Sequence, residues 1–280
     1  SECIQWIDME TTFDVNPAIK SFILEHAIEL DSMVNKSRNV IFTIQALQSL
    51  LKTYLISSET LKECPQYMYL RIAVFIHARK GTMEDIRNTY NDLSTHSYSH
   101  GSPTMMHALA VNAQVASCFL LPISEDSIEG VFKTVSKCAL LSKGAGGIGL
   151  TLSPIREEGA AIRSTGGTAK SLSYVCKVLD AVAAYADQGG GKRMGAFAVY
   201  LNDWHPEVAN GFLEIRTQGG PEHLKARNLF QGLMISDSFM EQVRDNGPWY
   251  FVSPHKYPEL LNLYGLAFKE RYFAIVQSDP

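Results

Sequence analysis

The chain has 280 residues, of which 46% are hydrophobic and 19% are charged, so it can bury a sizeable core in one or two domains and is not expected to be disordered. Its 25 basic and 29 acidic residues give a formal net charge of -4. This balance offers no electrostatic case for a nucleic-acid partner or a membrane surface, so any phosphate binding must come from local basic patches.

The cysteines and the apolar runs indicate the cellular compartment. The five cysteines are odd in number, widely spread and without the spacing of metal ligands, which is typical of a reduced, cytoplasmic protein without a metal site. The sequence shows no signal-peptide pattern at its start and no apolar run long enough to cross a bilayer. We therefore expect a soluble, cytoplasmic protein.

Glycine content divides the chain into two regions. Residues 1–100 contain almost no glycine and have helical patterns, whereas residues 101–280 are rich in glycine and alternate helical with strand-like patterns. We therefore expect a helical domain over 1–100 and a second, α/β domain over 101–280.

Four helices are predicted in the first region. Apolar residues recur with helical spacing over 22–34 and 43–56. A third helix begins at Pro65, because proline suits the first turn of a helix. Thr82 and Asp85 resemble the capping box of a fourth.

Strands and helices alternate in the second region. The predicted elements are a strand over 117–123, a helix over 126–143, a strand over 148–155, a helix over 172–186, a strand over 196–200 and a helix over 206–215. This succession implies a parallel sheet built from β-α-β units. The apolar stripe of the 172–186 helix is nearly heptad-spaced, which is compatible with packing on a partner helix, including one across a dimer.

Two glycine-rich segments resemble phosphate loops without matching the common ones. Residues 187–195 place three glycines before Lys192 and Arg193, but a P-loop needs glycine at Ala186 and a hydroxyl residue at Arg193. Residues 144–149 satisfy G-x-G-x-x-G, yet a helix precedes them and a strand follows, which is the reverse of a dinucleotide fold. Kinase and Rossmann sites are therefore disfavoured.

Two basic, glycine-bearing loops, 156–168 and 187–195, flank one predicted helix. Loops at the carboxyl ends of parallel strands are where such sheets bind ligands. The candidate phosphate partners are Arg156, Arg163, Lys192 and Arg193, and the candidate ribose or base partners are Asp126 and Asp187. The alternative is that these charges are only solvated, but four cations in two such loops favour a nucleotide.

Single cysteines and histidines give weaker signals. By spacing alone Cys118 is a small core residue of a strand, and Cys138 and Cys176 fall on apolar faces of helices. His205 follows Trp204 at the end of a strand and could act as a base. Because no partnered nucleophile is visible, a structural histidine is favoured.

Several motifs in one order resemble the large, catalytic subunit of class I ribonucleotide reductase. The segments that carry the resemblance are 117–121, 126–130, 142–149, 155–156, 165–168, 187–195 and 204–205. The resemblance implies a helical N-terminal region followed by about half of a ten-stranded α/β barrel, which is one parallel five-stranded half. It also implies an oxidoreductase that supplies deoxyribonucleotides for DNA synthesis.

The resemblance assigns roles to individual residues. Positions that hold a deoxynucleotide or ATP effector at a dimer interface match Asp126, Ser127, Ile128, Lys143, Arg156, Arg163 and Ser164, and Asp187 opens the loop that relays effector identity. Positions near the ribonucleoside diphosphate substrate match Ser102, Ser117, Gly147 and Arg193. Cys118 matches one of two cysteines whose oxidation to a disulfide reduces the ribose.

The implied chemistry needs partners. A thiyl radical removes the 3′ hydrogen, the 2′ hydroxyl leaves as water, and a dithiol reduces the intermediate. The implied partners are a second copy of the chain and a small subunit that carries the radical cofactor, with no cofactor bound covalently here. The thiyl cysteine, its asparagine and glutamate neighbours and the second redox cysteine lie on later segments of the family, so we expect the isolated chain to be inactive.

One departure and one alternative remain. The family's Asn-Ala-Gly-Thr-Asn-Arg-Pro run is replaced by residues 107–113, His-Ala-Leu-Ala-Val-Asn-Ala. The alternative function is a catalytically silent nucleotide-binding or interaction module derived from the same subunit.

Overall fold

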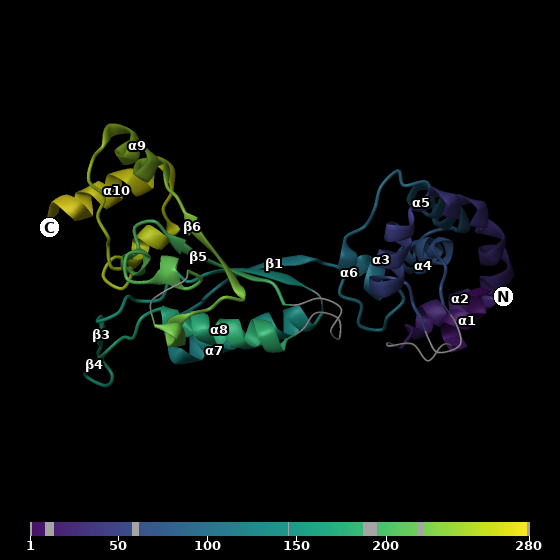
Figure 1. Ribbon diagram of the computed structural model, residues 1–280, viewed down its shortest axis with the longest axis horizontal. Coiled ribbons are helices and arrows are strands. Elements are labelled where there is room, and N and C mark those ends of the chain that lie inside the picture. Colours follow the sequence, from purple (N-terminus) through teal and green to yellow (C-terminus); the bar gives the residue numbers. More distant parts are fainter. Residues whose placement is uncertain are drawn as a thin grey trace. The chain divides into compact units, whose positions relative to one another are not determined.

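The computed structural model describes residues 2–8, 14–57, 62–144, 146–186, 195–217 and 221–278. The chain forms two compact units, Ser1–Ser117 and Cys118–Pro280, each with its own hydrophobic core (Figure 1). The boundary expected near residue 100 lies within the first unit.

The first unit is helical, as the sequence predicts. Its elements are α1 (Glu2–Asp8), α2 (Pro17–Met33), the 3₁₀ helix η1 (Lys36–Ile41), α3 (Ile44–Thr53), α4 (Pro65–His77), α5 (Met83–Ser94) and α6 (Ser102–His107). Local sequence explains the helix starts. Pro65 stands in the first turn of α4, and the predicted capping box of Thr82 with Asp85 is present at α5.

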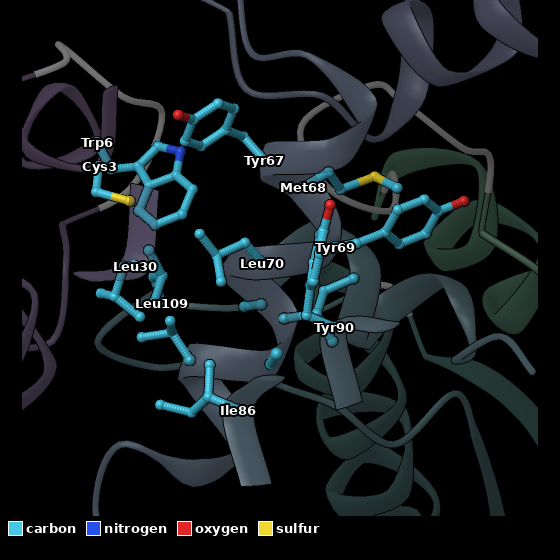
Figure 2. Close-up of a cluster of buried hydrophobic side chains, with 14 of the residues drawn as sticks. Cys3, Trp6, Leu30, Tyr67, Met68, Tyr69, Leu70, Ile86, Tyr90 and Leu109 are labelled. Carbon is cyan, nitrogen blue, oxygen red and sulfur yellow. The ribbon is translucent and has the colours of Figure 1, made fainter. Parts of the chain in front are cut away.

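Helix α4 lies at the centre of this unit. All its residues from Pro65 to Val74 are buried, which fits a helix that is apolar on nearly every side. Figure 2 shows Tyr67, Met68 and Leu70 among side chains from other helices, including Ile86 of α5. Trp6 packs edge-on against Tyr67 with ring centroids 5.8 Å apart.

One arginine ties α4 to the segments around it. The fully buried Arg71 forms a bidentate pair with Glu63, with Nε 2.9 Å from Oε1 and Nη2 3.1 Å from Oε2. Nη1 donates to the backbone carbonyl of Ala108 at 3.1 Å, and Nη2 also lies 3.2 Å from the carbonyls of Tyr54 and Met105. The guanidinium therefore satisfies polar groups from three segments inside an apolar core.

We predict that Arg71→Met lowers the free energy of unfolding of this unit by about 3–5 kcal/mol, because it leaves the buried Glu63 carboxylate unpaired. The control is Arg87→Ala, which removes an exposed pair with Glu84 and should cost about 1 kcal/mol or less. Urea unfolding followed by circular dichroism measures both. Equal losses in the two variants would contradict the role given to Arg71.

The second unit is an α/β layer structure. Its elements are β1 (Cys118–Pro122), α7 (Ile128–Lys143), β2 (Gly147–Thr151), β3 (Ala161–Ile162), β4 (Gly167–Thr168), α8 (Ser173–Tyr185), β5 (Phe197–Asn202), η2 (Pro206–Val208), η3 (Phe212–Glu214), η4 (Glu222–Leu224), β6 (Leu229–Met234), α9 (Asp237–Asp245), η5 (Pro258–Asn262) and α10 (Gly265–Ser278). In the described residues, four strands form a parallel sheet in the order β1-β2-β5-β6. This confirms the predicted fold class of a helical region followed by a parallel α/β unit.

The two faces of the sheet differ. Helices α7 and α8 lie along one face (Figure 1), over Ile148, Leu150 and Val199. The opposite face carries Leu120, Phe230 and Met234, whose exposed fractions are 85%, 54% and 56%. Within the described ranges, helices therefore cover only one face of the sheet.

One expectation from the sequence needs correction. The helix predicted over 206–215 is two separate 3₁₀ turns, η2 and η3, because Gly211 between them adopts a φ of 116° that a helix cannot contain. The apolar stripe of the 172–186 segment does pack on a partner helix, because α8 contacts α7 and Leu172 and Leu179 are buried in the core of the sheet.

A third cluster surrounds α10. Tyr272 is fully buried, stacks on Trp249 at 4.4 Å between ring centroids and lies beside Phe268. None of the helices in the described part of the chain is both long and apolar enough to span a membrane.

Candidate functional site

Four of the residues predicted from the sequence lie at two opposite ends of the parallel sheet. Cys118 and Gly147 begin β1 and β2, at the amino ends of the strands. Asp126 and Arg156 follow the same two strands, at their carboxyl ends. Five residues of strand separate the two ends by roughly 17 Å.

Cys118 is exposed, which corrects the reading of it as a core residue. It pairs with Gly147 in register, and both belong to the alternate positions that face the uncovered side of the sheet. Of the five cysteines, all of which the structure describes, it alone is exposed. Burial raises the pKa of Cys138 to about 11 and that of Cys176 to about 12, so these thiols stay protonated.

Of the other predicted substrate residues, the structure describes Ser117 and Ser102 but not Arg193. Ser117 directly precedes Cys118 and is exposed. Ser102 begins α6 in the first unit, and its hydroxyl lies 2.9 Å from that of Tyr54. Arg193, together with Asp187 and Lys192 of the glycine-rich loop, lies outside the described residues.

An ion pair fixes the carboxyl-end site. Arg156 donates from Nε to Asp126 Oδ2 at 2.7 Å and from Nη1 to the carbonyl of Ala161 at 2.8 Å. The two side chains are 19% and 24% exposed, so the pair is only partly solvated. Ser127 caps α7 by accepting from the N–H of Gly130 at 3.0 Å. A cation is therefore held beside a helix N-terminus, where anions bind well.

The remaining effector candidates spread away from this pair. Arg163 and Ser164 are exposed at the turn between β3 and β4, a hairpin that extends away from the sheet (Figure 1). Ile128 is exposed in the first turn of α7, whereas Lys143 ends the same helix roughly 22 Å away. One nucleotide cannot contact both ends of α7 in a single chain.

Two buried residues that follow β5, His205 and Glu207, bind backbone groups on either side of Arg156. His205 donates from Nε2 to the carbonyl of Ile155 at 2.8 Å and accepts at Nδ1 from the N–H of Glu207 at 3.1 Å. It is a structural histidine, as the sequence favours. The carboxylate of Glu207 accepts from the N–H of Glu158 at 2.8 Å and from Ser171 Oγ and the N–H of Leu172 at 2.9 Å each.

Sequence reasoning missed Glu207. The available signal was an acidic residue in a His-Pro-Glu turn just ahead of apolar residues, since a charge in such a place needs partners. Its partners lie 36 and 49 residues away along the chain, so no local pattern identifies them.

In the part of the chain that the structure describes, no three His, Cys, Asp or Glu side chains converge to hold a metal ion. A cavity of about 730 Å³ opens at the carboxyl ends of the strands, between Asn202, Trp204 and Phe268, and includes none of the predicted site residues.

The comparisons with known proteins agree with this arrangement. A family model described as "Ribonucleotide reductase, barrel domain" matches residues 116–280, and one described as "Ribonucleotide reductase, all-alpha domain" matches residues 41–113. The chain belongs to the ribonucleotide reductase family. The two models meet close to the boundary between the compact units, so the parallel sheet is part of the reductase barrel.

Curated relatives carry the same family name. The "Ribonucleoside-diphosphate reductase large subunit" of Arabidopsis thaliana is 40% identical over 89% of this chain and 30% of its own length. The "Ribonucleoside-diphosphate reductase large chain" of Encephalitozoon cuniculi is 39% identical over 92% of this chain and 33% of its own. "Large chain 2" of Saccharomyces cerevisiae is 37% identical over 92% and 30%. The chain thus spans 30–33% of the length of these relatives.

We predict that this reductase chain loses stability below neutral pH through His205. Burial lowers the pKa of His205 below its ordinary value of 6.5, and this outweighs the hydrogen bond to the Ile155 carbonyl and the nearby carboxylates, which raise it. Above 6.5 the ring is neutral in both states and stability is full. As pH falls from there towards the lowered pKa, the unfolded chain takes up a proton that the folded chain refuses, so unfolding is favoured.

Denaturant unfolding between about pH 7.5 and about pH 5.5 measures this effect. His205→Gln, whose amide keeps one donor and one acceptor, should be less stable at the higher pH but show a shallower dependence. An identical pH dependence in both proteins would show that His205 does not contribute.

Proposed function

We propose that the chain is a portion of the large, catalytic subunit of a class I ribonucleoside-diphosphate reductase, with an effector nucleotide at the carboxyl ends of the strands and the substrate at the amino ends. The observation that carries this proposal is the Arg156–Asp126 pair beside the N-terminus of α7. The names of the relatives, each a ribonucleoside-diphosphate reductase large subunit or large chain, support it.

The carboxyl-end site has the chemistry for a deoxynucleoside triphosphate or ATP. The guanidinium of Arg156 and the exposed Arg163 supply positive charge for phosphates, and the capped start of α7 adds its helix dipole. Asp126 and Ser127 offer oxygen acceptors for ribose or base donors. In this proposal Asp187 and its loop pass the identity of the effector to the substrate.

A second copy of the chain would complete this site. Lys143 is too far along α7 to reach a nucleotide at Ser127 of the same chain, but an antiparallel α7 from a partner would bring its own Lys143 there. Ile128, Phe132 and Leu140 of α7 are 75%, 55% and 68% exposed, and this apolar stripe supports pairing of α7 helices.

At the amino end, Cys118 would act as one of two reducing thiols. It and a second cysteine would give up two electrons and two protons to form a disulfide, while the ribose loses its 2′ hydroxyl as water. Exposure of Cys118 on the uncovered face supports access to substrate, and the exposed apolar residues of that face support cover by a further half-barrel. The initiating radical would come from a small subunit.

The alternative, a silent nucleotide-binding module, shares the effector site but makes no use of Cys118. We also propose a cytoplasmic location, supported by the absence of disulfides among the five cysteines. Reduction of a ribonucleoside diphosphate by the whole subunit with its small subunit, lost on Cys118→Ser, distinguishes the enzyme from the module.

We predict that this chain retains a labelled deoxynucleoside triphosphate and that Asp126→Ala and Arg156→Ala each raise its Kd by about tenfold or more, because each breaks the pair that holds the cation. The control is Arg227→Ala, which removes an exposed arginine paired with Glu222. Equilibrium dialysis measures the Kd. Binding that survives both substitutions unchanged would refute the effector site.

We further predict that Phe132→Glu shifts the chain from dimer to monomer, because it buries a charge in the proposed α7 interface. Tyr264→Glu is the matched control, since Tyr264 is 82% exposed and lies outside α7. Sedimentation velocity over a range of concentrations reports the oligomeric state. A chain that is monomeric throughout, or equal effects of the two substitutions, would argue against this interface.

A further inference from the structure

The geometry points to Glu207 as the positioning residue of the effector loop, which is the segment 158–172 that follows Arg156. The buried carboxylate of Glu207 binds both ends of this segment, and it thereby fixes the position of Arg156 before a nucleotide binds. This inference rests on the proposed effector site and adds to it a residue that makes no contact with the nucleotide.

The contacts of Glu207 lie at the two ends of one loop. At the near end Oε1 accepts the N–H of Glu158, and at the far end Oε2 accepts the N–H of Leu172 and the hydroxyl of Ser171. Between these ends the chain forms the β3–β4 hairpin, which Gly159 and Ala169 extend through backbone hydrogen bonds. A single carboxylate thus joins the two strands of the loop at its base.

Arg156 stands between fixed backbone groups. The carbonyl of Ile155, one residue before it, is held by His205, and the N–H of Glu158, two residues after it, is held by Glu207. The side chain of Glu157 accepts from Ser253 Oγ at 3.0 Å, which adds a third attachment. These attachments restrict the backbone of Arg156, and its hydrogen bonds to Asp126 and to the carbonyl of Ala161, which lies inside the loop, hold the guanidinium.

An ionised carboxylate suits this place. Two N–H groups and one hydroxyl converge on Glu207, and only a carboxylate offers acceptors on both of its oxygens. The site also lies at the N-terminus of α8, where the helix dipole favours negative charge. Glu207 is fully buried, so release of the loop would leave its charge unsatisfied, and that cost keeps the loop closed.

This closure has a consequence for binding. A loop that is ordered in advance does not lose conformational entropy when the nucleotide binds, so its contacts contribute more fully to affinity. Weakening the base of the loop should lower nucleotide affinity even though Asp126, Ser127 and Arg156 are unchanged.

The test is Glu207→Gln, in which an NH₂ group replaces one acceptor oxygen and faces a donor. Asp180→Asn is the matched control: it makes the same change at another buried carboxylate of this unit, whose Oδ1 accepts only the N–H of Asn228 among the bonds described, at 2.7 Å. Glu207→Gln should raise the hydrogen-exchange rates of the backbone amides of Glu158 and Leu172 by about tenfold or more. Asp180→Asn should instead speed the amide of Asn228.

Nucleotide binding is measured on the same proteins, with each of the four deoxynucleoside triphosphates in turn. Glu207→Gln should raise the Kd by about tenfold, whereas Asp180→Asn, at a similar loss of stability, should leave it within about twofold. Ser171→Ala removes one donor and serves if Glu207→Gln does not fold. It should speed the Leu172 amide and raise the Kd by about threefold.

Unchanged exchange at Glu158 and Leu172, or an equal loss of affinity in the two carboxylate variants, would overturn the positioning role. If the unmodified chain binds none of the four nucleotides, the proposed effector site fails. The exchange rates would still decide whether Glu207 closes the loop.

Discussion

The common direction of the four strands of the parallel sheet is the constraint on which the arrangement of the site depends. Parallel neighbours require crossover connections, and α7 and α8 provide two of these on the same face of the sheet. Each of these four strands therefore starts at one end of the sheet and finishes at the other. Cys118 and Arg156 are separated for this reason, although each belongs to a segment next to β1 or β2.

The parallel arrangement also gives the amino and carboxyl ends of the strands different surroundings. The amino ends open on the uncovered face, where glycine stands at the register partner of Cys118. The carboxyl ends continue into loops, and these are tied down by buried polar groups, namely His205 and Glu207. Among the described residues, this buried hydrogen-bond network lies at the carboxyl ends of the strands. In the helical unit, the buried Arg71 likewise donates hydrogen bonds to backbone carbonyls from several segments.

Much of the fold could be predicted because its signals are local. Proline at the start of α4, the capping box of α5 and the apolar spacing of α7 each lie within a few residues. The helix predicted over 206–215 failed because periodicity does not register the positive φ of Gly211. The β3–β4 hairpin was missed because two-residue strands in a polar loop have no periodicity to detect.

The site was harder to predict than the fold. Alternation along β1 could not say which of its faces is covered, so Cys118 looked like a core residue until the resemblance to the family gave it a role. The His-Pro-Glu turn marks Glu207 as a charge that needs partners, but it does not say which, because its donors come from a loop that is distant in sequence. Long-range partners and the choice of covered face are decided by tertiary packing, which a single sequence does not display.

Because Cys118 is exposed, its thiol is accessible to labelling reagents. The thiols of Cys3, Cys138 and Cys176 are buried and that of Cys64 is partly covered, so a maleimide reagent meets Cys118 first on the folded chain. A fluorophore attached there would lie at the amino ends of the strands, one strand length, or roughly 17 Å, from their carboxyl ends. It would report events at the amino ends of the strands from a position remote from Arg156 and Asp126.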